Sequence, residues 1–183
     1  MAQRWRVSRQ SPPKPRPPLD GDSLEQLALN YVGRYATTRA KLRVYLARKL
    51  RERGWHDETA PPVATLAEKF AGLGYIDDAG FARSRAASLG RRGYGARRVA
   101  LALHAAGIEE QDAVDAREIA EAGAWEAAQV FARKRRIGPF ADSPLDPLRR
   151  RKALAAMIRA GHSYEIARKF VESEVGISPD HGD

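Results

Sequence analysis

Apolar side chains recur every three or four residues along most of this chain, the spacing that places them on one face of an α-helix. The clearest stripe is formed by Leu42, Tyr45, Leu46 and Leu50, with basic residues on the opposite side of the same helix. No segment alternates β-branched residues for long enough to predict a strand. The pattern therefore predicts an all-α protein.

Capping residues and glycines divide this pattern into about nine short helices. Ser23 is the expected cap of the first helix, Thr37 or Thr38 of the second, and Asp77 or Asp78 of the fourth. The fourth helix should direct Phe81 and Ala82 inward. The expected helices cover approximately residues 24–35, 39–53, 63–74, 78–92, 96–106, 110–122, 124–136, 147–160 and 164–175.

Glycines that end helices recur at a nearly fixed distance. Gly54, Gly107 and Gly161 are 53 and 54 residues apart, and an apolar residue stands four positions before each of them. Self-similarity at such a period is typical of stacked helical units, each too small to bury its apolar face alone. We expect an elongated solenoid of three tandem three-helix repeats, over residues 24–76, 77–122 and 123–175.

The two ends of the chain differ from this helical part. Residues 1–23 hold several arginines among five prolines, a composition that favours polyproline or coil. We expect a flexible, disordered, basic Pro-rich tail there and a short C-terminal tail over residues 176–183.

Composition adds a preference for anionic partners. The 183 residues carry 32 Lys+Arg against 23 Asp+Glu, a formal net charge of +9, which predicts attraction to nucleic acid or to a nucleoprotein. Arginine outnumbers lysine 25 to 7. This bias suits bidentate phosphate or carboxylate contacts, although a GC-rich genome produces the same excess.

Several kinds of chemistry are absent from the sequence. Without cysteine, disulfides, thiol nucleophiles and sulfur-ligated zinc are excluded, and a reducing cytoplasm fits best. Neither a phosphate-binding loop nor a dinucleotide fingerprint occurs, and no membrane span or signal core is present. Asp77 and Asp78 are better explained by helix capping than by acid–base catalysis. We therefore expect no cofactor, no metal site, no membrane partner and no enzymatic activity.

Basic clusters recur in or before the middle helix of each repeat. Each cluster alone is compatible with an ordinary solvated helix face, but their recurrence favours a surface that follows a long polyanion. Tyr94 lies between glycines and arginine pairs, where its ring could stack on a base. The candidate binding residues are Lys41, Arg48, Arg51, Arg91, Arg92, Tyr94, Arg97, Arg98, Arg133, Lys134, Arg135, Arg136, Arg149, Arg150, Arg151 and Lys152.

Segment 109–121 is strongly acidic, with six Asp or Glu against the single Arg117. It could meet a basic protein surface, or it could pair inside the solenoid with the cluster at 133–136. The internal pairing is favoured.

Several motifs together resemble the RecX family of recombinase regulators, over about residues 24–175. The middle repeat carries the most specific part of the resemblance, and the first and third repeats agree with it. These motifs are Gly74-Tyr75-Ile76-Asp77-Asp78, Phe81-Ala82, Gly93-Tyr94-Gly95, Arg98-Val99, Leu103, Gly107-Ile108, Thr38, Leu42, Leu46, Leu50, Gly54, Gly161-His162-Ser163-Tyr164 and Ile166. Thr38 and His162 depart from the family, which more often has a serine and an aromatic residue there.

The resemblance implies a bacterial cytoplasmic protein that binds the RecA recombinase, chiefly its filament on single-stranded DNA. Such proteins modulate, and mostly inhibit, ATP hydrolysis, strand exchange and co-protease activity. The family is described as lodging in the helical groove of the filament and as able to contact DNA as well. For this chain we expect single-stranded DNA as a partner, with double-stranded DNA as a further candidate. We expect a monomer.

Two other functions fit the same sequence. A basic helix-turn-helix DNA-binding transcription regulator would also be helical, but it should dimerise and prefer one palindromic sequence. A helical-repeat adaptor that grips peptides would show little salt dependence.

Overall fold

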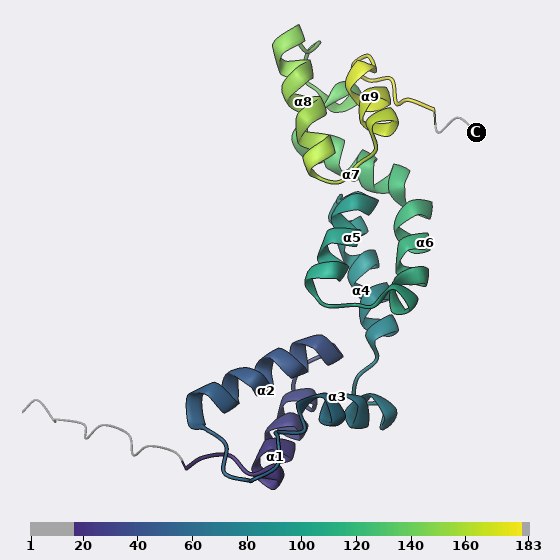
Figure 1. Cartoon of the computed structure of the whole chain (residues 1–183). Coiled ribbons are helices and arrows are strands. Elements are labelled where there is room, and N and C mark those ends of the chain that lie inside the picture. Colours follow the sequence, from purple (N-terminus) through teal and green to yellow (C-terminus); the bar gives the residue numbers. More distant parts are fainter. Residues whose placement is uncertain (1–16, 181–183) are drawn as a thin grey trace, which may run out of the picture.

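The computed structural model describes residues 17–180 and contains, within that range, helices, loops and a single isolated β-bridge (Figure 1). The prediction of an all-α fold is confirmed, whereas the expected tail lies outside the described residues up to position 16. The α-helices are α1 (Gly21–Val32), α2 (Arg39–Arg53), α3 (Val63–Gly72), α4 (Asp78–Arg91), α5 (Ala96–Ala105), α6 (Val114–Ala122), α7 (Ala124–Arg135), α8 (Pro147–Arg159) and α9 (Tyr164–Glu172), with short 3-10 helices η1 (Glu110–Ala113) and η2 (Gly138–Phe140).

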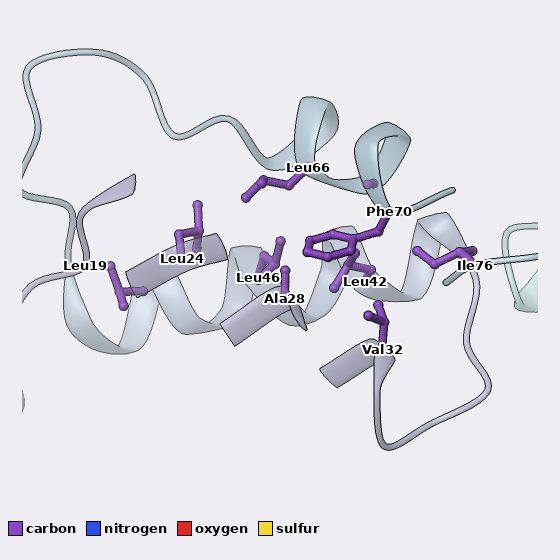
Figure 2. Packing of buried hydrophobic residues seen from close by; sticks show 10 residues of the cluster. Leu19, Leu24, Ala28, Val32, Leu42, Leu46, Leu66, Phe70 and Ile76 are labelled. Atoms are coloured by element: carbon purple, nitrogen blue, oxygen red, sulfur yellow. The ribbon is translucent and has the colours of Figure 1, made fainter. Parts of the chain in front are cut away.

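The helices form three successive modules, each with a hydrophobic core of its own. We call them module 1 (α1–α3), module 2 (α4–α6) and module 3 (α7–α9). Figure 1 shows them following one another, so that the molecule is elongated. Leu42, Leu46 and Phe70 lie in the core of module 1 (Figure 2), Val99 in that of module 2 and Met157 in that of module 3. The origin of these modules as tandem repeats stays a prediction.

The first module begins earlier than the sequence pattern indicates. Asp20, rather than Ser23, caps α1, since its side chain accepts a hydrogen bond from the backbone N–H of Ser23. Leu19 is fully buried and forms a parallel bridge with Trp55. Part of the segment assigned to the flexible tail, residues 17–23, therefore belongs to module 1.

The middle helices of the modules meet end to end. The backbone N–H of Gly95, before α5, donates to the carbonyl of Ala160 at the end of α8 (3.0 Å), and Arg97 N–H donates to Gly161 (3.2 Å). At the other end of α5, the Thr38 hydroxyl donates to the carbonyl of Ala106 (2.8 Å). The C-terminus of α8 thus meets the N-terminus of α5, and the C-terminus of α5 meets the N-terminus of α2, so that the partial charges of the helix ends attract one another.

Glycines make these joints possible. Gly107 and Gly161 end α5 and α8 with φ of +69° and +98°, as expected for helix-stopping glycines. A Cβ on Gly107 would lie 2.2 Å from the Cβ of Ala40, and one on Gly161 would lie 2.4 Å from the backbone nitrogen of Arg98. Only glycine lets adjacent modules approach this closely.

His162 is a buried imidazole at the joint between modules 2 and 3. Its Nε2 bonds the carbonyl of Gly93 (3.1 Å), while its buried Nδ1 has no hydrogen-bond partner. Burial lowers the pKa of this imidazole below its usual value, although the Gly93 contact opposes the shift. The folded state therefore binds fewer protons than the unfolded state, and its stability decreases as the pH falls below about 6.5.

We predict that the His162→Phe variant loses this part of the pH dependence. The measurement is the midpoint of thermal unfolding at about pH 7.5 and about pH 5.5, the range in which an imidazole titrates. The midpoint of thermal unfolding should fall further between the two pH values for the wild type than for the variant. An equal loss in both proteins would contradict the assignment to His162.

No helix within residues 17–180 combines the length and the apolar character needed to cross a bilayer.

Candidate functional site

A groove of about 570 Å³ lies at the joint between modules 1 and 2. One lysine from α2, three arginines and two aromatic rings dominate its walls. The lining residues are Lys41, Phe81, Arg85, Leu89, Arg92, Tyr94, Arg98, Leu101, Ala102, Ala105 and Ala106. We call this surface the joint groove.

The joint groove contains cations but no carboxylate. Among the described residues, Lys41, Arg85, Arg92 and Arg98 have no ion pair. The pKa of Lys41 is lowered by burial and by repulsion from Arg85. An anion entering the groove would relieve this repulsion, so the electrostatics favour an anionic ligand.

Two aromatic rings accompany these cations. The Lys41 Nζ lies 4.3 Å from the centre of the Phe81 ring, and the guanidinium carbons of Arg92 and Arg98 lie 5.4 and 6.0 Å from the centre of Tyr94. These are cation–π distances, and they hold the cations beside flat apolar faces. A groove of this composition can take up a phosphate and a stacked base together.

Local sequence explains most of this arrangement. Phe81, Arg85 and Leu89 are four residues apart on α4 and therefore share one face of the helix. The chain then turns at Gly93, whose φ is +88° and where a Cβ would lie 2.9 Å from the backbone nitrogen of Phe131. The turn places Tyr94 beside Arg98 of α5.

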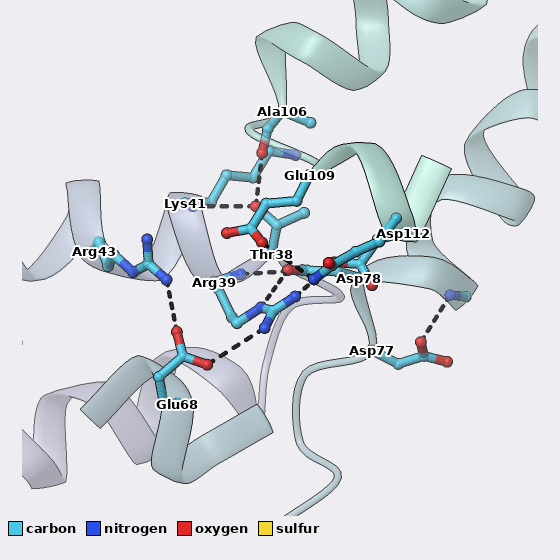
Figure 3. A network of polar contacts seen from close by, with 12 residues as sticks. Thr38, Arg39, Lys41, Arg43, Glu68, Asp77, Asp78, Ala106, Glu109 and Asp112 are labelled. Atoms are coloured by element: carbon cyan, nitrogen blue, oxygen red, sulfur yellow. Dashed lines mark hydrogen bonds and ion pairs between the residues drawn. The ribbon is translucent and has the colours of Figure 1, made fainter. Parts of the chain in front are cut away.

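A polar clasp, formed by Arg39 with Asp78, Asp112 and Glu68, fixes the part of the groove that comes from module 1. Arg39 Nε lies 2.7 Å from the Asp78 carboxylate, whose other oxygen accepts a hydrogen bond from the Arg39 backbone N–H (3.1 Å) (Figure 3). Asp78 is buried, with 3% of its side chain exposed. Because Lys41 is two residues beyond Arg39, this clasp determines where Lys41 meets the groove.

The same guanidinium reaches two further carboxylates, those of Asp112 (2.5 Å) and Glu68 (3.3 Å), and Glu68 also pairs with Arg43 (2.7 Å). The hydrogen bond that the Arg39 side chain donates to Asp78 is the main cause that raises the pKa of Arg39. Burial would raise the pKa of Glu68, but its bonds to Arg43 and Arg39 outweigh burial and lower it. Arg39 and Glu68 are therefore both charged around neutral pH.

The groove joins four of the residues singled out in the sequence: Lys41, Arg92, Tyr94 and Arg98. Arg85 was missed, and Phe81, expected in the core, is only half-buried and lines the groove. The signal that could have identified Arg85 is its spacing of four residues from Phe81, which places both side chains on one face of α4. Asp77 does cap α4, by accepting a hydrogen bond from Gly80 N–H (2.7 Å).

The remaining candidate cations lie outside the joint groove. Arg91 and Arg97 are exposed beside it, and Arg48 and Arg51 lie further along α2. Arg133, Lys134, Arg135 and Arg136 end α7, where Lys134 bonds the carbonyl of Arg92 and Arg136 pairs with Asp142. Arg149, Arg150, Arg151 and Lys152 are exposed in the first turns of α8.

The acidic segment has other partners than expected. Asp112 pairs with Arg39, Asp115 with Arg83 (3.1 Å) and Glu110 with Arg117. The predicted pairing with residues 133–136 is therefore wrong for these three acids. The cations come instead from α2, α4 and α6 itself, because module 2 packs η1 and α6 against α4.

Residues 17–180 contain no group of three or more acidic or histidine side chains positioned to hold a metal ion. The chemistry that the groove offers is binding of anionic and aromatic groups.

Fold and groove define an all-helical, modular protein with a cation-lined groove at a joint. Curated relatives named Regulatory protein RecX are 36% identical over 160 residues in Myxococcus xanthus, covering 82% of this chain and 84% of the relative, and 31% identical over 139 residues in Agrobacterium fabrum, covering 73% of each. The chain belongs to the RecX family of regulatory proteins.

Solved structures agree with this assignment at the level of the fold. The crystal structure of RecX from Lactobacillus salivarius has a TM-score of 0.58 at 21% identity and covers 82% of this chain and 94% of that one. A second crystal structure, of regulatory protein RecX, has a TM-score of 0.63 at 22% identity and covers 82% and 72%. No protein-family model matches the chain.

Proposed function

We propose that this regulatory protein binds the RecA recombinase and its filament on single-stranded DNA in the bacterial cytoplasm. There it modulates, and mostly inhibits, ATP hydrolysis, strand exchange and co-protease activity. The joint groove would contact the DNA or an acidic surface of the filament. The observation that carries this proposal is a groove with four cations, two aromatic rings and no carboxylate in its walls.

The elongated arrangement of modules supports the same function. An extended molecule can span several protomers of a filament, and several weak contacts then act together without any covalent chemistry. The regulatory names of the relatives agree with a protein that acts by binding.

The test is ATP hydrolysis by the RecA recombinase on single-stranded DNA at increasing concentrations of this protein. The triple variant Arg85→Glu, Arg92→Glu, Arg98→Glu should need at least about tenfold more protein for half inhibition. Three exposed charge contacts of about 0.5 kcal/mol each together amount to that factor. The loss should be larger at low salt, where screening is weaker.

A matched control changes the same number of charges away from the groove. The variant Arg159→Glu, Arg168→Glu, Lys169→Glu alters exposed side chains of module 3 that belong neither to the joint groove nor to the basic clusters singled out in the sequence. It should inhibit nearly as well as wild type. Equal inhibition by wild type and the groove variant would refute the assigned surface, and selective binding of one palindromic duplex would indicate the helix-turn-helix alternative instead.

A further inference from the structure

A second groove, of about 500 Å³, lies on module 1 between the end of α1 and α2. Three tyrosines and three cations make up nearly all of its wall. The lining residues are Asn30, Tyr31, Arg34, Tyr35, Tyr45, Arg48 and Lys49. We call this surface the tyrosine groove.

Its rings form a partly open stack. Tyr31 and Tyr45 are stacked, with ring centres 4.2 Å apart and an angle of 16° between their planes, and Tyr35 is tilted against Tyr31 at 5.5 Å. Tyr31 and Tyr45 also pack against the core of module 1, whereas Tyr35 is 59% exposed. Tyr31 and Tyr45 therefore contribute to the core of module 1. Core packing does not account for Tyr35, because its ring is exposed.

Cations surround this exposed ring. No ion pair involves Arg34 in the part of the chain that the structure describes, while Arg48 and Lys49 share the carboxylate of Glu52 (3.7 and 2.6 Å). Arg48 and Lys49 also lie 5.7 and 5.9 Å from the centre of the Tyr45 ring. Three cations against one nearby carboxylate leave the groove positively charged, which selects an anionic ligand.

Both grooves border α2, with no lining residue in common. Lys41 lines the joint groove, while Tyr45 and Arg48 line the tyrosine groove. All three lie within one stripe of the helix, so that Tyr45 borders the basic residues instead of lying opposite them as the sequence pattern suggested. Lys41 and Arg48 are seven residues apart, or about 10 Å along the helix axis. That length corresponds to about three nucleotides at the spacing of a strand in B-DNA.

We propose that the tyrosine groove binds single-stranded nucleic acid, with a base stacked on Tyr35 and phosphates beside Arg34, Arg48 and Lys49. The same strand continues into the joint groove. Aromatic rings next to cations, without a pattern of hydrogen-bond donors, are typical of binding that tolerates any sequence. This inference rests on the proposed function, because it extends the DNA contact of the joint groove by a second site.

The test measures binding of a fluorescent oligothymidylate to the full chain by anisotropy, at several salt concentrations and without recombinase. The variant Arg34→Ala, Tyr35→Ala should bind at least about fivefold more weakly, because it removes a stacking ring and a phosphate contact. The slope of log affinity against log salt should fall by about 0.7, the value for one phosphate contact on a single strand.

The control variant Tyr164→Ala, Arg168→Ala removes an exposed tyrosine and an exposed arginine from α9. It should bind like wild type. In addition, an oligonucleotide with 5-bromodeoxyuridine should form a photochemical cross-link that mass spectrometry locates at Tyr35. Unchanged affinity and salt slope in the Arg34→Ala, Tyr35→Ala variant would overturn the inference.

An acidic peptide is the competing ligand. If this variant kept full oligothymidylate binding but lost binding of polyglutamate, the groove would be a peptide site and the inference would be wrong. These binding measurements contain no recombinase. The role of the joint groove in inhibiting ATP hydrolysis is therefore tested separately, by the ATPase assay of the groove variant.

Discussion

The Arg39→Ala variant should lose about 3 kcal/mol of the free energy of unfolding, with the damage concentrated between modules 1 and 2. Arg39 is the side-chain partner of Asp78, whose carboxylate is almost completely buried. Removing one member of such a pair leaves an uncompensated charge in the interior, which typically costs about 3–5 kcal/mol. We expect a loss at the lower end of this range because 20% of the Arg39 side chain is exposed to solvent.

The matched control is Arg43→Ala, one turn further along α2. Within residues 17–180, Arg43 pairs only with the exposed carboxylate of Glu68, and exposed pairs contribute at most about 1 kcal/mol. Urea denaturation of both variants measures the difference, and small-angle scattering should show a changed overall dimension for Arg39→Ala alone. Equal destabilisation of the two variants would refute a special role of the Asp78 contact.

This clasp also connects stability with the proposed function. Lys41 belongs to module 1, whereas Arg85, Arg92 and Arg98 belong to module 2, so that the joint groove exists only when the two modules keep their relative position. Arg39 itself touches neither groove in the structure. We infer that it acts as a positioning residue for the joint groove.

Local signals in the sequence were sufficient for the helices and for most of their ends. Thr38 caps α2 and Asp77 caps α4, because these side chains bond N–H groups three residues ahead and need no distant partner. The N-terminus of α1 was harder, since Asp20 and Ser23 are both good capping residues. Asp20 is the cap in the structure, and the residue before it, Leu19, forms a bridge with Trp55. This contact spans 36 residues of sequence, so helical periodicity does not reveal it.

The candidate site could be predicted residue by residue but not as a surface. Lys41 and Tyr94 were singled out separately, and their meeting depends on the joint between modules 1 and 2. Arg85 was overlooked because helical periodicity alone does not show which side of Phe81 is covered by a neighbouring module. The partners of the acidic segment were mistaken for the same reason, since Asp112 reaches Arg39 across 73 residues.

Gly161→Ala should destabilise the protein by about 3–4 kcal/mol through the joint between modules 2 and 3. The φ of +98° is strained for any residue with a Cβ, at a cost of about 1–2 kcal/mol. The new Cβ would also lie 2.4 Å from the backbone nitrogen of Arg98. Moving away from it would break the bonds that Gly95 and Arg97 donate to the end of α8, worth about 1 kcal/mol each.

Gly74→Ala separates the strain of the backbone from the contact between modules. Gly74 has a φ of +77°, but a Cβ there would meet no atom within 4 Å, so only the strain of about 1–2 kcal/mol applies. Calorimetry should therefore show a clearly larger fall in thermal stability for Gly161→Ala, together with a separate transition as module 3 uncouples from the rest. If both variants lost the same amount, the end-to-end contact of α8 and α5 would contribute nothing measurable. A larger loss at Gly161 alone would mean that the distance between modules, rather than the conformation of single glycines, limits which residues these joints accept.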